Sequence, residues 1–114
     1  MAAIANLRID QGATFSSDVT VTDSNGDAFD LTGYTASAKM AKGYASTKTR
    51  TQITTSIASD PTTGVVTLSL TADQTNALDA PARYVYDVEI TRTSDSTITR
   101  VIEGIITISP SVTT

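Results

Sequence analysis

The feature of this sequence that most limits its fold is an alternation of apolar and polar residues with a period of two. It is clearest over residues 84–90, where Tyr84, Tyr86, Val88 and Ile90 share one parity. Successive side chains of a strand point to opposite faces, so this pattern predicts a half-buried β-strand. The same alternation predicts further strands at 15–21, 36–40, 53–57 and 66–70, and a last one at 98–108 that bends or bulges at Gly104.

Turn and cap residues separate these segments. The Asn25-Gly26 pair predicts a hairpin turn, and a second turn is expected over residues 60–64. Thr71 and Gln74 have the spacing of a capping box, which predicts a short helix at about residues 72–78 that ends before Pro81.

About seven short strands with turns every 8–12 residues are typical of a sandwich or barrel. We therefore expect one all-β domain over residues 1–114, an immunoglobulin-like antiparallel β-sandwich with one short helix. Residues 1–9 are expected to form an N-terminal edge strand or an arm on a neighbouring molecule, and residues 110–114 a C-terminal tail. Tyr84, which follows Leu78 and Pro81, is either a tyrosine corner or an ordinary core residue.

The composition argues against an enzyme. The 114 residues include no cysteine and no histidine, which removes disulfides, thiolate nucleophiles and the commonest general base and metal ligand. We expect no catalytic residue, no cofactor and no metal site. The formal net charge of −4 also makes the chain a poor binder of nucleic acid.

The N-terminus has neither the basic region nor the apolar run of a signal peptide, and no stretch approaches transmembrane length. The sequence therefore predicts synthesis in a cytoplasm and no membrane partner.

Two carboxylate clusters have ordinary structural explanations. The segment 23–30 resembles a calcium loop, but the glycine and the bidentate glutamate of an EF-hand are not at the required positions. Asp87, Glu89 and Glu103 could form the carboxylate pair of a glycosidase, yet their parity places them on the solvent face of strands.

Charge is segregated along the chain. Half of the basic residues lie within twelve positions, around Gly43 and Tyr44: Lys39, Lys42, Lys48 and Arg50. An acidic block precedes them: Asp18, Asp23, Asp27 and Asp30. One interpretation is a solvated hairpin. The other is a basic contact loop that meets an acidic surface, such as the Asp-rich turn of an adjacent copy.

Six segments in order also resemble a known group of proteins. They are Ile9–Phe15, Val21–Gly26, Asp30–Tyr34, Gly64–Thr71, Tyr84–Ile90 and Glu103–Ile108. Their order and spacing are similar to those of small virion structural proteins of tailed bacteriophages, particularly cyanophages. They also resemble the immunoglobulin-like N-terminal domains of phage baseplate upper proteins.

This resemblance implies a non-enzymatic building block of a virion. Its place would be as a capsid decoration or cement protein, or as an accessory of the neck, tail or baseplate. The expected partners are major capsid, neck or tail proteins and copies of the chain itself. An alternative is an adhesion domain for a host surface or glycan, with Tyr34 and Tyr44 as the available aromatic side chains.

Overall fold

The computed structural model describes residues 3–43 and 50–112. The described residues form eight strands, one short α-helix and one 3₁₀ turn. The strands are β1 (Ala3–Ile4), β2 (Leu7–Asp10), β3 (Phe15–Thr20), β4 (Tyr34–Ala41), β5 (Thr51–Ile57), β6 (Val65–Leu70), β7 (Ala82–Arg92) and β8 (Ile98–Ser109). The 3₁₀ turn is η1 (Pro61–Thr63), and the helix is α1 (Ala72–Asn76).

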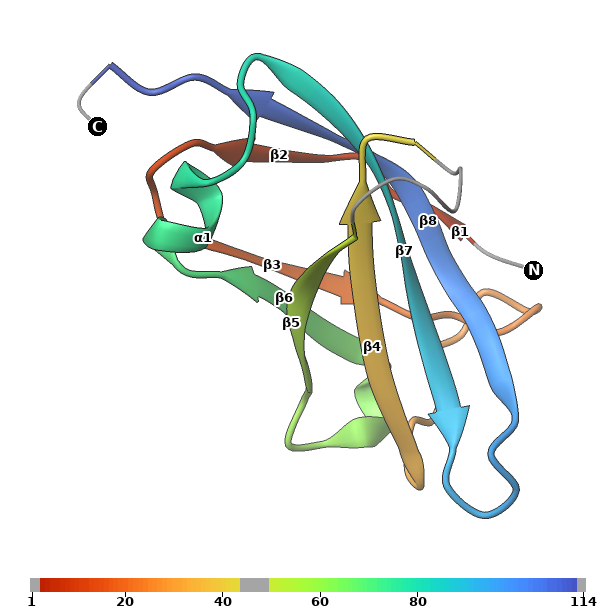
Figure 1. Cartoon of the computed structure of the whole chain (residues 1–114). Coiled ribbons are helices and arrows are strands. Elements are labelled where there is room, and N and C mark those ends of the chain that lie inside the picture. Colours follow the sequence, from red (N-terminus) through yellow and green to blue (C-terminus); the bar gives the residue numbers. More distant parts are fainter. Residues whose placement is uncertain (1–2, 44–49, 113–114) are drawn as a thin grey trace.

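The strands are joined into one curled sheet. Its order is β1-β8-β7-β4-β5-β6-β3, and β2 continues the edge beside β8. Strand β5 passes from one half to the other, because its first residues pair with β4 and its later residues with β6. The sheet therefore folds over on itself and encloses the core between its two halves (Figure 1).

The predicted all-β fold with one short helix is confirmed. The hydrogen-bonded path is continuous, so the two halves are not separate sheets, and the immunoglobulin-like topology stays a prediction. The helix is shorter than expected and ends at Asn76, with Ala77 as its C-cap.

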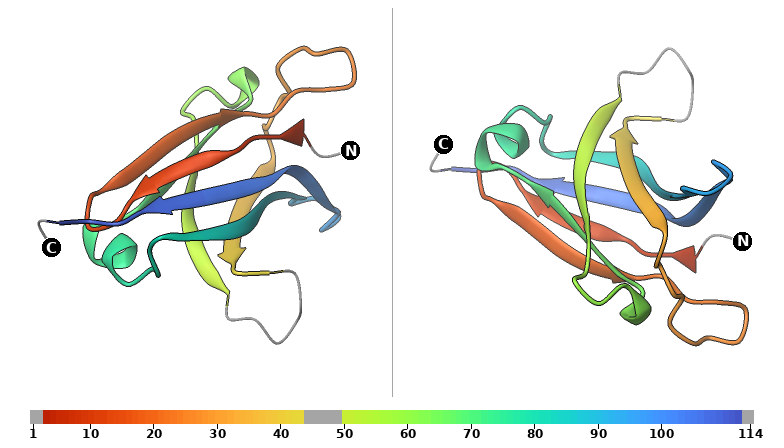
Figure 2. Two further views of the ribbon diagram at one scale, coloured as in Figure 1. Left: turned by 90° about the horizontal axis from the view of Figure 1, so that it is seen from above. Right: turned by 90° about the horizontal axis from the view of Figure 1, so that it is seen from below.

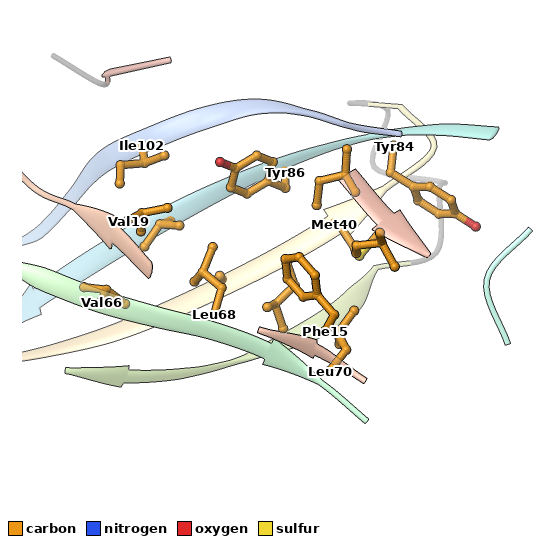
Figure 3. Close-up of a cluster of buried hydrophobic side chains, with 14 of the residues drawn as sticks. Phe15, Val19, Met40, Val66, Leu68, Leu70, Tyr84, Tyr86 and Ile102 are labelled. Carbon is orange, nitrogen blue, oxygen red and sulfur yellow. The ribbon is translucent and has the colours of Figure 1, made fainter. Parts of the chain in front are cut away.

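The core is built from the inward parity of the strands. Val66, Leu68 and Leu70 of β6 face Tyr86 and other residues of β7 and β8 across the interior (Figure 3). The alternation predicted these inward residues, since every second position of β6 and β7 is buried.

The N-terminal edge differs from the expected antiparallel arrangement. Strands β1 and β2 run parallel to β8, with Ala3 beside Ile102 and Leu7 beside Ile106. A parallel pair needs a long connection between its strands, and here nearly the whole domain is that connection. The prediction of a purely antiparallel sheet is therefore wrong at this edge.

The predicted irregularity at Gly104 is also displaced. The register between β7 and β8 shifts after Val88, which leaves Val101 of β8 as the extra residue. Gly104 remains in regular pairing with Tyr86, and its missing side chain serves a different purpose. The carbonyl oxygen of Ala5 occupies the space that a Cβ would need.

Polar contacts cap helix α1 at its start and hold the segment that follows it. The side chain of Thr71 accepts a hydrogen bond from Gln74 N, and Gln74 Oε1 accepts one from Thr71 N, which completes the predicted capping box. After the helix, Asp79 N donates to the Tyr84 hydroxyl over 3.0 Å. This bond back to upstream backbone has the geometry of a tyrosine corner.

Candidate functional site: the charged ends of the molecule

One end of the molecule is formed by turns, and the Asp-rich segment belongs to it. The turn between Thr22 and Ala28 is held by Asp23, whose Oδ1 accepts hydrogen bonds from Asn25 N at 2.9 Å and Asp27 N at 3.1 Å. These bonds orient Asp23 toward its own turn and leave Asp27 exposed to solvent. The predicted Asn-Gly turn is present, with Gly26 at φ +84°.

Asp30 lies beside this turn and shapes the approach to β4. Its Oδ1 accepts a hydrogen bond from Thr32 N at 2.9 Å, and hydrogen bonding by Thr32 lowers the pKa of the Asp30 carboxyl. The next residue, Leu31, donates its N–H to the carbonyl of Pro61 in η1. Asp60, which caps η1, is thereby brought to the same end.

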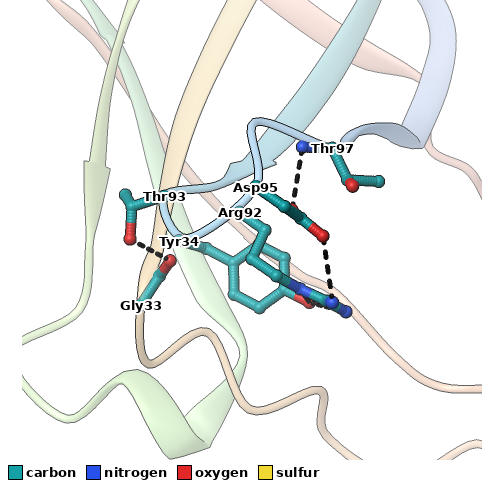
Figure 4. A network of polar contacts seen from close by, with 6 residues as sticks. All are labelled: Gly33, Tyr34, Arg92, Thr93, Asp95 and Thr97. Atoms are coloured by element: carbon teal, nitrogen blue, oxygen red, sulfur yellow. Dashed lines mark hydrogen bonds and ion pairs between the residues drawn. The ribbon is translucent and has the colours of Figure 1, made fainter.

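The hairpin between β7 and β8 completes this end (Figure 4). Thr93 donates its N–H and its hydroxyl to the carbonyl of Gly33, which fastens the hairpin to the start of β4. Arg92 donates to the Tyr34 hydroxyl over 3.2 Å and lies 3.6 Å from Asp95 Oδ2. Hydrogen bonds from Thr97 lower the pKa of the Asp95 carboxyl.

These turns gather five exposed aspartates at one end. We call this region the acidic end, and its carboxylates are those of Asp23, Asp27, Asp30, Asp60 and Asp95. Among the described residues, Arg92 is the basic side chain that accompanies them. The acidic end therefore has a formal charge of −4, equal to the net charge of the whole chain.

The basic residues follow β4 toward the other end of the molecule. Lys39 is exposed on the outer face of β4, in register with Asp87 of β7. It lines a shallow hollow of about 200 Å³ together with Gly43, Arg50, Asp87 and Glu89. Opposite charges therefore share this hollow.

Lys42 and Arg50 flank the connection between β4 and β5, and we call them the basic end. Lys42 Nζ is paired with the carboxylate of Asp79, and this hydrogen bond raises the pKa of the lysine. Arg50 donates to the carbonyl of Gly43 over 3.2 Å. Tyr44 and Lys48, the other two predicted contact residues, lie outside the described residues.

The structure separates the two charge blocks within one molecule. Asp30 precedes β4 and Lys42 follows it, so the eight residues of the strand lie between them. At the usual rise of a strand, that length is roughly 25 Å. The basic end of one molecule can therefore reach an acidic end only on a neighbouring molecule.

The acidic block is also divided. Asp18 lies on β3, away from the turns, and its Oδ1 accepts a hydrogen bond from the hydroxyl of Thr67 on the neighbouring strand at 2.6 Å. Asp60 and Asp95 were missed by the sequence analysis. Asp60 precedes Pro61 and Asp95 precedes Ser96, and each lies in a turn. The two turns are far apart in sequence and come together only in the folded chain.

The other carboxylates are arranged as expected for an outer sheet face. Asp87 lies in register with Glu103 and is paired with Arg100, whose Nε is 3.3 Å from Asp87 Oδ2. Over residues 3–43 and 50–112, no three acidic side chains come close enough to hold a metal ion.

Neither sequence-based comparison relates the chain to a known group. In the described part of the chain, no helix has the length and apolar character needed to cross a membrane. No protein-family model matches the chain, and the search of curated proteins gives no match.

Proposed function

We propose that this chain is a non-enzymatic structural subunit of a tailed-phage virion, either a capsid decoration or cement protein or an accessory of the neck, tail or baseplate. Its copies and partners are held together by contacts between surfaces of opposite charge. The observation that carries this proposal is the concentration of the net charge at the acidic end, with Lys42 and Arg50 beyond the far end of β4.

Such a charge distribution favours end-to-end contact. An interface between two different surfaces of the same chain is heterologous, and it builds rings when the rotation closes and filaments when it does not. Complementary charges guide the encounter and fix the register, while the repetition of a weak contact over many copies supplies the strength. The resemblance to small virion proteins supports the same role.

The first test measures what the purified protein binds. Size-exclusion chromatography with light scattering is run on the protein alone, with empty phage capsids and with isolated tails. Co-elution with capsids supports decoration or cement, and co-elution with tails supports a neck or baseplate position. A monomer that binds neither contradicts the proposal, and a glycan array then tests the adhesion alternative.

A second test addresses the charged ends directly. Lys42→Glu combined with Arg50→Glu is expected to weaken association at low salt, where charge interactions are least screened. The matched control, Arg8→Glu with Arg83→Glu, makes the same change in net charge at other exposed arginines. Assembly by the first variant that equals the wild type contradicts the end-to-end contact.

Reversing the charge of the acidic end tests whether association can be rescued. Asp23→Lys with Asp27→Lys carries positive charge on the acidic turn, so this variant alone should also associate weakly. A mixture of this variant with the Lys42→Glu, Arg50→Glu variant offers two complementary contacts: the two unchanged ends with each other, and the two reversed surfaces with each other. Association in the mixture but in neither variant alone is the expected result.

A further inference from the structure

The curled sheet does not close, and two strand edges face each other along its open side. Among the described strands, one edge is formed by β1 and β2, which pair with β8 alone, and the other is β3, which pairs with β6 alone. We call the space between these edges the open seam. Figure 2 shows β2 and β3 running along the same side of the molecule.

Among the described residues, the backbone N–H and C=O groups along the outer edge of β3 form no hydrogen bonds to another strand. Val21 N donates to Gly64 O over 2.7 Å, so Val21 faces β6. Hydrogen-bonded residues alternate along an antiparallel ladder, and positions 15, 17 and 19 therefore face β6 as well. The N–H and C=O groups of Ser16, Asp18 and Thr20 therefore point away from the sheet. Such a row of unpaired backbone groups can accept another strand.

Hollows lie at both ends of the seam. The first, of about 240 Å³, is lined by residues of both edges, including Leu7 and Arg8 from β2 and Phe15 and Ser17 from β3. The second, of about 650 Å³, lies beyond the last residue of β3. Its apolar walls come from Ala3, Val21, Phe29 and Val101, and Asp23 is at its margin.

Asp18 determines which strand this edge can accept. Its side chain is exposed on the outer face of β3, next to Thr67. If β3 of a second copy paired with it about the centre of the strand, the two Asp18 carboxylates would lie directly opposite each other, which is unfavourable. A strand with Lys or Arg at that position is favoured instead, because it forms a cross-strand ion pair.

We propose that β3 accepts an extended segment of a different protein as an added antiparallel strand. Its basic side chain faces Asp18, and a large apolar side chain opposite Val21 enters the second hollow. Side chains opposite Val19 and Ser17 point into the seam and are small. Backbone hydrogen bonds supply affinity and the alternate side chains supply specificity, as in other cases of strand addition.

This inference rests on the proposed assembly function, since it assigns a surface for a second virion protein. It uses the edge of β3, which touches the acidic end only where the second hollow meets Asp23, and the two are tested by different experiments. The edge is tested on the isolated protein with a peptide, whereas the end-to-end contact is tested by the salt-dependent assembly described above.

The probe is a blocked peptide of sequence LTVKSTV. In antiparallel register its leucine lies opposite Val21 and its lysine opposite Asp18. Titrated into ¹⁵N-labelled protein, it is expected to shift the amide signals of Ser16, Asp18 and Thr20 in a saturable way. Signals that stay unchanged up to about 2 mM peptide overturn the proposal, because a dissociation constant above this range means very weak binding. Shifts confined to another strand edge also overturn it.

A charge exchange tests the role of Asp18. Replacing the lysine of the peptide by glutamate is expected to weaken binding about fivefold, in keeping with one cross-strand ion pair. The Asp18→Lys variant should reverse this preference and bind the glutamate peptide more tightly than the lysine peptide. Equal binding of both peptides by both proteins contradicts the assigned register.

A backbone substitution tests the strand addition itself. Thr20→Pro removes an N–H that points away from β6, so the fold is expected to persist while peptide binding is lost. Thr20→Ala is the matched control and should bind as the wild type does, since it keeps the N–H. If Thr20→Pro does not fold, the charge exchange at Asp18 decides the question. A folded Thr20→Pro protein that binds normally overturns the proposal.

Discussion

The Cα of Gly104 lies directly against the carbonyl oxygen of Ala5, so that a Cβ on residue 104 would stand 2.1 Å from that oxygen. The same oxygen accepts a hydrogen bond from the Tyr86 hydroxyl at 2.6 Å. Ala5 lies between β1 and β2, and its N–H donates to the carbonyl of Glu103. The close approach therefore fixes the position of the N-terminal edge on β8.

Gly104→Ala is expected to destabilise the protein by about 2 kcal/mol or more, because the added methyl group and the Ala5 carbonyl cannot both keep their positions. Urea unfolding followed by circular dichroism measures the change. Gly26→Ala is the control: its φ of +84° is unfavourable for alanine but nothing lies within 4 Å, so about 1 kcal/mol is expected. Equal losses in the two variants would show that Ala5 gives way easily.

Tyr86→Phe is expected to cost about 1–2 kcal/mol, because the part-buried carbonyl of Ala5 loses its bond from the hydroxyl. The ring itself stays in the core, where Tyr86 is 3% exposed. Chemical denaturation gives the free energy, and faster hydrogen exchange of the Ala5 amide would place the loss at the N-terminal edge. A variant as stable as the wild type argues that water replaces the hydroxyl.

The burial of Tyr86 also predicts that the stability of the fold decreases at alkaline pH. Burial raises its pKa from 10.0 to about 12 in the folded protein. The folded state keeps the proton to a higher pH than the unfolded state does. The stabilisation is therefore complete below pH 10 and is lost as the pH rises toward about 12. Urea midpoints measured across this range should fall more steeply for the wild type than for Tyr86→Phe, and parallel curves would contradict the assignment.

Thr75 is a buried hydroxyl residue that joins α1 to the turn between β2 and β3. Its Oγ1 donates to Ala13 O at 2.8 Å and accepts from Gly12 N at 3.1 Å. Thr75→Val keeps the shape but leaves both backbone groups without this partner, so a loss of about 2–3 kcal/mol is expected. Thr75→Ser retains the hydroxyl and should lose less. The order of the two variants in thermal or urea unfolding checks the argument.

Much of the fold was predictable from local patterns. The alternation over residues 84–90 identified the inward residues of β7, since side-chain parity in a strand decides which face is buried. The capping box of Thr71 and Gln74 identified the start of α1, because both partners lie within four residues of each other. Such features depend on neighbours in sequence, and the sequence contains all of their parts.

The candidate contact surfaces were predictable only in part. The basic and acidic residues could be recognised by their type, and Asp23, Asp27 and Asp30 do lie at one end of the molecule. Asp60 and Asp95 join them through the bonds of Leu31 to Pro61 and of Thr93 to Gly33. The distance between the two ends also had to come from the fold.

By itself, then, the sequence determined the strand segments, their buried faces and the short helix, because side-chain period and caps act locally. The tertiary structure decided which strands are neighbours, where the sheet stays open and why residue 104 is glycine. Backbone hydrogen bonds between strands are the same for every residue type. Pairing such as that of β2 with β8 is therefore settled only when the whole core packs together.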